Sequence, residues 1–176
     1  LQSRARLGMP AWGRKSPEMT FSSLLITLSQ GLQDPSPLRR AATADALSLW
    51  DHERVVAFLL RALDDEDAQV RASVAAALGR IGDKTAVDAL ENRLTDPSVW
   101  VRKAAIDALG AIGDPQSVAA LEQALSQEDT LVREAAVCAL GHMATPKARQ
   151  ILEECTENQE ATMRWYAARG LGEIGG

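Results

Sequence analysis

Residues 101–114 read VRKAAIDALGAIGD, and residues 70–83 read VRASVAAALGRIGD. The second stretch lies 31 residues before the first, and the two agree at eight of fourteen positions. A fixed period of roughly 20 to 50 residues is typical of proteins that stack one supersecondary unit many times. These two stretches therefore predict a repeat architecture.

The 31-residue spacing holds at four slots along the chain. Arginine fills the first slot, at Arg40, Arg71, Arg102, Arg133 and Arg164. Leucine fills the second, at Leu47, Leu78, Leu109, Leu140 and Leu171. Six residues before the arginines stand Asp34, Asp65, Asp96, Gln127 and Asn158. One residue after the leucines stand Ser48, Gly79, Gly110, Gly141 and Gly172.

Each period is predicted to contain two helices. In the third period, Asp96 can cap a helix N-terminus, and Pro97 suits the first helical position, where its missing N–H costs nothing. Apolar residues then recur at helical spacing. Gly110 and Gly113 are expected to end this helix because glycine adopts positive φ without strain. The residues at 114–115 repeat the cap and proline for the second helix.

A helix pair of this size cannot bury its own apolar faces, so neighbouring pairs must stack into a solenoid. Residues 1–19 are basic and are expected to be disordered, and the apolar run from Phe21 is expected to be a helix rather than a signal sequence. Ten helices are predicted over residues 20–176. The predicted units are the half repeat 20–33, the full repeats 34–64, 65–95, 96–126 and 127–157, and the half repeat 158–176.

The segment from Asp65 to Leu90 follows the pattern D-x-x-x-x-V-R-x-x-A-x-x-A-L-G-x-I-G-D-x-x-A-V-x-x-L almost completely. In this it resembles the short HEAT-like repeat of bacteria, which is shared with the phycobilin lyase subunits of cyanobacteria and with phycobilisome-degradation proteins. The resemblance covers about residues 21–176. It implies an all-α fold, a right-handed α-α superhelix (α-solenoid) of HEAT-like helical hairpins. The matching residues are structural, so no catalytic residue is carried over.

The repeated arginines and aspartates predict a structural ladder. Each guanidinium can bond carboxylates or carbonyls of its own repeat and of the neighbouring repeat. Residues that recur at the repeat spacing usually serve the interface between repeats. The predicted ladder consists of Arg40, Arg71, Arg102, Arg133 and Arg164 with Asp34, Asp65 and Asp96.

The partner-binding surface is expected on the second helices, which line the concave groove in HEAT-like stacks. The candidate residues are Leu60, Arg61, Asp88, Glu91, Asn92, Glu122, Gln123, Glu153 and Glu154. In this order the groove changes from nearly apolar to acidic. Equivalent glutamates at 91, 122 and 153 form a stripe that can steer a basic partner. The alternative is that glutamate is simply a good exposed helix former.

Aromatic residues add one further candidate surface. Trp50 and Trp100 are expected to pack in the core, because large aromatic side chains usually contribute buried area. Trp165 occupies a slot that holds alanine, lysine or glutamate in other repeats, and Tyr166 lies beside it. This pair is a possible secondary contact near the C-terminal end.

Composition excludes several classes of function. Residues 1–20 carry a net charge of +3, so the rest of the chain carries −8 of the total of −5. An acidic body argues against nucleic-acid binding, and no apolar stretch approaches the roughly 20 residues of a membrane span. Cys138 and Cys155 have no disulfide or metal spacing, which favours a reducing, cytoplasmic compartment. Cys138 and His142 lie four residues apart, but two ligands make a weak site, so no metal is expected.

Two functions follow from these observations. The first is a non-enzymatic scaffold or adaptor that binds a protein partner, with a basic surface, along the groove and needs no cofactor. The alternative, implied by the resemblance, is a phycobilin lyase subunit or a phycobilisome assembly or degradation factor. Such a protein would handle a phycobilin, which is a linear tetrapyrrole, or bind a phycobiliprotein or a second HEAT-like subunit.

Overall fold

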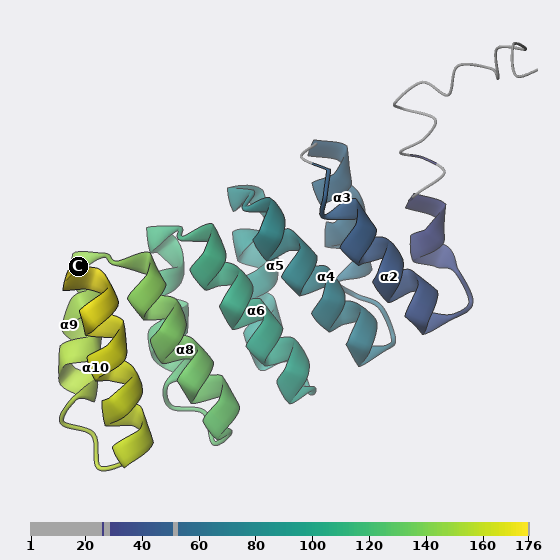
Figure 1. Cartoon of the computed structure of the whole chain (residues 1–176). Helices are drawn as coiled ribbons and strands as arrows, with labels where there is room; N and C mark the ends of the chain where they lie inside the picture. The colour runs from purple at the N-terminus through teal and green to yellow at the C-terminus, as the bar shows by residue number, and fades with distance from the viewer. Residues whose placement is uncertain (1–25, 27–28, 51–52, 176) are drawn as a thin grey trace, which may run out of the picture.

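The computed structural model describes residues 26, 29–50 and 53–175, and over these residues it contains helices and no strand. The helices form two layers in an elongated array (Figure 1). The first helix of each repeat lies in one layer, and the second helix lies in the other. The all-helical, stacked architecture expected from the repeats is confirmed.

The bounds of the helices follow the repeats. The first layer contains α2 (Pro37–Leu47), α4 (Ala68–Ile81), α6 (Val99–Ile112), α8 (Thr130–Met143) and α10 (Ala161–Gly175). The second layer contains α3 (Glu53–Ala62), α5 (Val87–Asn92), α7 (Val118–Ala124) and α9 (Pro146–Cys155). Short 3-10 turns are η1 (Gly31–Gln33), η2 (Lys84–Ala86), η3 (Arg93–Thr95) and η4 (Pro115–Ser117). The five first-layer helices begin at residues 37, 68, 99, 130 and 161, which are 31 residues apart.

Nine α-helices have bounds within the described residues. The tenth predicted helix, at 20–33, falls largely outside the part of the chain that the structure describes, as does the predicted disordered segment 1–19.

Aspartates cap the starts of some helices and turns, though at one position the expected residue has another role. Asp67 accepts backbone N–H bonds at the start of α4, and Asp114 caps η4 with Pro115 at the first position, as expected. The predicted cap at Asp96 was wrong. The α6 helix begins after Ser98, and the Asp96 carboxylate accepts the Ser98 N–H at 2.9 Å, in the turn before the helix. This position leaves the carboxylate free to bond the preceding repeat.

Gly79 and Gly110, which follow two of the repeated leucines, lie where neighbouring first-layer helices approach closely. A Cβ added to Gly79 in α4 would stand 2.7 Å from the Cα of Ala108 in α6. A Cβ added to Gly110 would stand 2.9 Å from the Cα of Ala139. Gly110 and Gly113 were both expected to end this helix; Gly113 does so, with a φ of 68°, whereas Gly110 lies within α6. The role of Gly110 is therefore to let two helix backbones come together.

Leucines from both layers form the core between the layers. The fully buried ones are Leu47, Leu59, Leu63, Leu78, Leu90, Leu109, Leu121, Leu140 and Leu152. They belong to one continuous apolar cluster that extends from Leu32 to Ala167. Burial of each leucine side chain contributes about 2 kcal/mol. Because each helix pair shares this cluster with its neighbours, the stack is stabilised as a unit rather than repeat by repeat.

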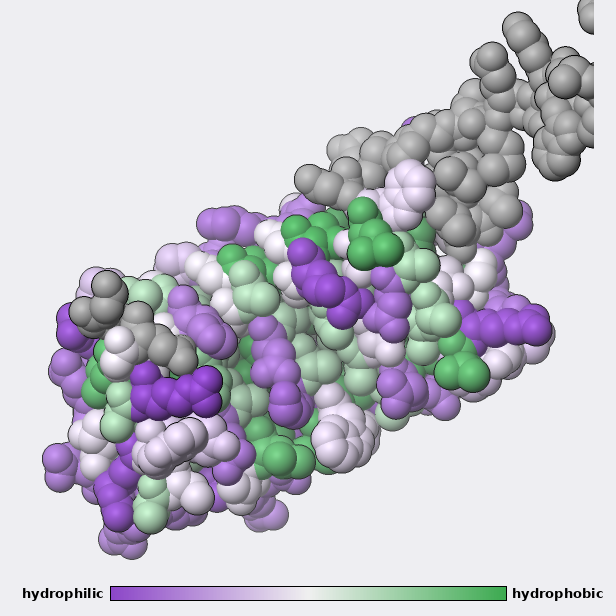
Figure 2. Space-filling view, viewed as in Figure 1, coloured by the Kyte–Doolittle hydropathy of each residue, from purple (hydrophilic) through white to green (hydrophobic). Residues whose placement is uncertain are grey.

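The first-layer face is a mosaic of apolar and polar areas (Figure 2). Trp50 packs against the core, as expected. The prediction for Trp100 was wrong, because its side chain is 63% exposed. It occupies the second position of α6, and the leucines at the equivalent positions of α2 and α8, Leu38 and Leu131, are also exposed. This slot faces solvent at the start of each helix, so its identity is not fixed by packing.

Candidate partner-binding surface

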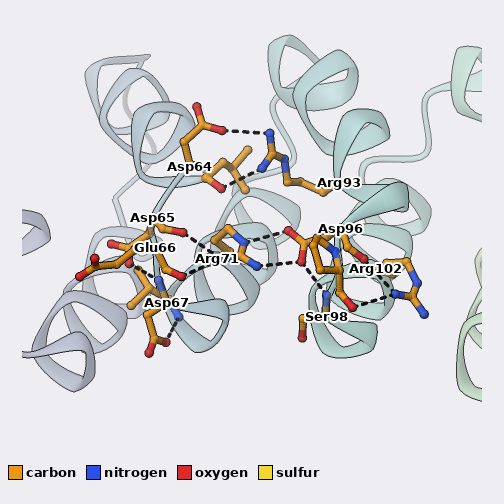
Figure 3. A network of polar contacts seen from close by, with 12 residues as sticks. Asp64, Asp65, Glu66, Asp67, Arg71, Arg93, Asp96, Ser98 and Arg102 are labelled. Carbon is orange, nitrogen blue, oxygen red and sulfur yellow. Dashed lines mark hydrogen bonds and ion pairs between the residues drawn. The ribbon is translucent and has the colours of Figure 1, made fainter.

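Ion pairs of the ladder connect the first two repeat interfaces. The Arg71 Nη1 donates to the backbone carbonyl of Asp65 at 2.9 Å, within its own repeat. Its Nε and Nη2 donate to the two carboxylate oxygens of Asp96 in the next repeat, both at 2.8 Å (Figure 3). Arg40 makes the same two-pronged contact with Asp65, at 2.7 and 2.8 Å. Each arginine therefore bonds a carbonyl on one side and a carboxylate on the other.

The hydrogen bonds determine how these aspartates titrate. The Arg40 side chain, together with the Asp67 N–H, lowers the pKa of Asp65 below its ordinary value of 3.8. Burial acts to raise the pKa of Asp96, but the Arg71 and Ser98 hydrogen bonds outweigh it, and the net shift is downward. A lowered pKa contributes stability above the unfolded-state pKa, and this contribution is lost as the pH falls below it. The ladder therefore stabilises the protein at neutral pH.

The ladder changes where the aspartate slot holds Gln127. Arg102 donates to the carbonyls of Asp96 and Pro97 in its own repeat. Its Nε is buried without a hydrogen-bond partner. The Gln127 amide donates instead to the carbonyl of Leu94. The expected bond from Arg102 to a carboxylate of the next repeat is therefore absent.

At the last interface a different residue supplies the carboxylate. Arg133 bonds the carbonyls of Gln127 and Glu128, and its Nη2 donates to both carboxylate oxygens of Glu160 at 3.1 and 2.8 Å. Arg164 donates to two carbonyls of its own repeat. The remaining ladder acid, Asp34, lies 3.4 Å from the exposed Arg39.

We expect Gln127→Asp to stabilise the protein, because an aspartate there can accept the buried Arg102 Nε as Asp96 accepts Arg71. Hydrogen bonds to charged groups contribute about 1.5 to 3 kcal/mol, and loss of the Gln127 to Leu94 bond offsets about 1 kcal/mol of this. The net gain should be about 1 kcal/mol in the free energy of unfolding, measured by urea denaturation at pH 7. The gain should vanish in an Arg102→Met background; a gain that persists there has another source.

The second-layer surface, formed by α3, α5, α7 and α9, contains a hollow between α5 and α7. This α5–α7 hollow has a volume of about 520 Å³. Its lining residues are Glu91, Asn92, Leu94, Thr95, Gln116, Ala119, Ala120, Gln123, Ala124 and Gln127. Three of the predicted site residues, Glu91, Asn92 and Gln123, therefore meet there. The small alanine side chains of α7 leave this space open, and four amide side chains and one carboxylate surround it.

Glu91 has the least compensated carboxylate in the predicted stripe. The side chain is half-buried, and its Oε1 is buried without a hydrogen-bond partner. Burial raises the pKa of Glu91, and the negative charges of Asp88 and Asp114 raise it further. Asp88 itself accepts the Gln116 amide at 2.9 Å. Because the folded-state pKa lies above the unfolded one, this carboxylate reduces stability as the pH rises through that interval.

The other acidic candidates have partners within the chain. The Lys147 Nζ lies 3.6 Å from Glu122, and the Arg149 Nε lies 3.5 Å from Glu153. The Glu154 carboxylate accepts the Gln150 amide at 3.0 Å. The stripe is therefore uneven in charge rather than continuously acidic.

At the other end of this surface the predicted apolar part is small. Leu60 is half-buried and packs against the core, whereas Arg61 is exposed. Arg61 lines a second hollow, of about 420 Å³, together with the acidic residues Asp34, Asp64, Asp65 and Glu66. In the next repeat Arg93 bonds Asp64 at 2.9 Å. Arg61 thus lies beside a group of carboxylates.

Trp165 and Tyr166 belong to the first layer, so the structure does not bring them to the second-layer surface. Their rings meet edge to face with centroids 4.9 Å apart, and the Arg169 guanidinium lies 5.9 Å from the Trp165 ring centroid. Trp165 is 59% exposed. Trp100 is an exposed aromatic residue that was not predicted as one; the signal for it in the sequence is the variable slot that it shares with Leu38 and Leu131.

A metal-binding cluster and a membrane-spanning helix are both absent from the described residues. They contain no group of three or more His, Cys, Asp or Glu side chains arranged to hold a metal ion. Within the same ranges, no helix is long and apolar enough to span a membrane.

Comparison with known proteins identifies the repeats. A model of HEAT repeats matches residues 26–101 and 89–172. A comparison with curated proteins finds no match. The chain is similar to a solved complex of CpcE and CpcF of phycocyanin lyase from Nostoc sp. PCC7120. The TM-score is 0.72 at 23% identity, covering 98% of this chain and 70% of that one.

Two other solved structures show the same likeness. Escherichia coli YibA has a TM-score of 0.68 at 21% identity, covering 85% of this chain and 59% of that one. A designed armadillo repeat protein in complex with the peptide (KR)4 has a TM-score of 0.62 at 18% identity, covering 89% and 84%. At these identities the likeness concerns the fold alone. Because the family model covers most of its length, the chain belongs to the HEAT repeat family.

Proposed function

We propose that the protein is a non-enzymatic interaction module that binds a protein partner along its second-layer surface. The observation that carries this proposal is the α5–α7 hollow, where a carboxylate and four amides surround a space left open by alanines. Such a hollow offers hydrogen bonds in a recess, which is what an inserted partner side chain requires. Solenoids commonly bind along the surface that stacked repeats extend.

Two of the structural relatives support this function. The CpcE and CpcF structure is a complex of two chains, and the designed armadillo protein is bound to a basic peptide. Both are helical repeat proteins that hold another polypeptide. The acidic residues of the second-layer surface suit a partner with a basic surface, because complementary charge accelerates association.

Binding kinetics test this function. A partner captured from a lysate of the native host would be purified, and its association measured at low and high salt. The triple variant Glu91→Gln, Glu122→Gln, Glu153→Gln should associate more slowly by about fivefold at low salt and should differ less at high salt, where charges are screened. Association at the wild-type rate under both conditions would show that these glutamates do not attract the partner.

The bilin-handling alternative rests on the fold shared with the CpcE and CpcF complex. None of the ten residues that line the α5–α7 hollow is aromatic, and this favours a polypeptide over a tetrapyrrole in that place. Incubation with a phycobilin tests the alternative. A red-shifted absorbance spectrum of protein-bound bilin would support it, and an unchanged spectrum would favour the interaction module.

A further inference from the structure

We infer that the α5–α7 hollow is a binding site for one arginine side chain of the partner, with Glu91 as its counter-ion. This inference rests on the proposed function and adds the chemical identity of the group that is bound. Its basis is a difference between the surroundings of Glu91 and those of Glu122, which occupies the same slot in the next repeat.

The comparison concerns the cation beside each glutamate of the stripe. Glu122 has Lys147 at 3.6 Å, and Lys147 follows Gln116 by 31 residues. Gln116 therefore occupies, beside Glu91, the position from which lysine reaches Glu122 in the next repeat. The Gln116 amide bonds Asp88 instead, and the Glu91 Oε1 is left buried without a partner. The chain thus supplies its own cation at one glutamate and omits it at the other.

The surroundings of Glu91 match a guanidinium better than other ligands. A guanidinium has five N–H donors in a plane, so it can bond a carboxylate and several amide oxygens together. Asn92 and Gln123 line the same hollow and offer such oxygens. A metal ion would need more carboxylate or imidazole ligands than this hollow contains. An anion would be repelled by Glu91, Asp88 and Asp114.

The negative charges near Glu91 come from its own helix and from the start of η4 in the next repeat. Asp88 lies on α5, and Asp114 lies just before η4, where Lys84 pairs with it at 3.2 Å. Both carboxylates disfavour ionisation of Glu91. A bound guanidinium would relieve this repulsion and the cost of burying an unpaired charge. Binding of a guanidinium is therefore expected to relieve unfavourable electrostatics at Glu91 without breaking a hydrogen bond that Glu91 already makes.

The test uses the full chain and a fluorescent (KR)4 peptide as the probe, with fluorescence anisotropy at low salt. Glu91→Gln should weaken binding by about tenfold or more, the effect of losing a hydrogen-bonded charge pair. The matched control is Glu153→Gln. Glu153 occupies the same slot as Glu91 in a later repeat, but its carboxylate is already paired with Arg149. The control should weaken binding by less than about threefold, the effect expected of an exposed pair.

A second variant keeps Glu91 and fills its site from within the chain. Gln116→Lys should place an ammonium beside Glu91, as Lys147 stands beside Glu122, and should reduce binding at least as much as Glu91→Gln. Replacement of the arginines of the probe by citrulline, which is neutral and similar in shape, should have the same effect on the wild-type protein.

The outcomes separate this inference from the proposed function. Selective loss with Glu91→Gln and Gln116→Lys, with Glu153→Gln little changed, supports the arginine site. Equal loss with Glu91→Gln and Glu153→Gln overturns it, since only the overall charge would then matter. Absence of any binding of the probe to the wild-type chain also overturns it. A captured partner that still binds the second-layer surface in either case leaves the proposed function standing.

Discussion

Gly110→Leu is expected to destabilise the protein by about 3 kcal/mol or to prevent its folding, because a side chain there has no space. Even a Cβ would lie 2.7 Å from the Cβ of Ala139 and 2.9 Å from its Cα, so the α6 and α8 backbones would have to separate. Overpacking of a close-packed interior costs about 1 to 3 kcal/mol and sometimes more. The measurement is thermal unfolding followed by far-ultraviolet circular dichroism.

Gly172→Leu is the matched control for this substitution. Gly172 lies in α10, and nothing stands within 4 Å of an added Cβ. Leucine has the higher helix propensity, so Gly172→Leu should leave stability unchanged or raise it by about 0.5 to 1 kcal/mol. Equal destabilisation by both substitutions would mean that helix contact is not the reason for the glycine at 110.

Arg71→Ala is expected to cost about 3 kcal/mol in the free energy of unfolding. Removal of the guanidinium leaves the Asp96 carboxylate, whose side chain is only 3% exposed, without its counter-ion. Loss of one member of a buried pair typically costs about 3 to 5 kcal/mol, and the partial exposure of Arg71 places the effect at the lower end. Urea denaturation at pH 7 provides the measurement.

Arg102→Ala is the comparison for this second prediction. Arg102 bonds carbonyls but no carboxylate of the next repeat, so its loss should cost less, about 1.5 kcal/mol, the lower end for hydrogen bonds to a charged group. Arg71→Ala combined with Asp96→Ala should cost less than the sum of the two single changes. Equal costs at Arg71 and Arg102 would show that the carboxylate adds no stability.

The sequence predicted the stacked helix pairs because the same packing problem recurs in each repeat. An arginine, a leucine and a glycine at fixed spacing must meet equivalent neighbours, so their recurrence reveals the interface without coordinates. The role of Gly110 was mistaken because glycine serves both helix ends and close backbone approach. Only the position of α8 distinguishes the two.

The functional surface could be predicted only in part. The glutamates at 91, 122 and 153 share one register, and the sequence presents them as equivalent. They differ because Lys147 and Arg149 approach two of them in space, whereas Gln116 bonds Asp88 and leaves Glu91 unpaired. Trp100 was misplaced for a similar reason, since helical spacing does not reveal whether the start of a helix is covered by its neighbour.

Site-specific photo-crosslinking tests most directly whether the partner binds the second-layer surface. A benzophenone side chain would replace Ala119, which is exposed beside the α5–α7 hollow, or Ala168, which is exposed on α10 near Trp165. We expect covalent adducts with the captured partner from position 119 and none from position 168. Adducts from position 168 alone would contradict the claim and would assign binding to the first layer.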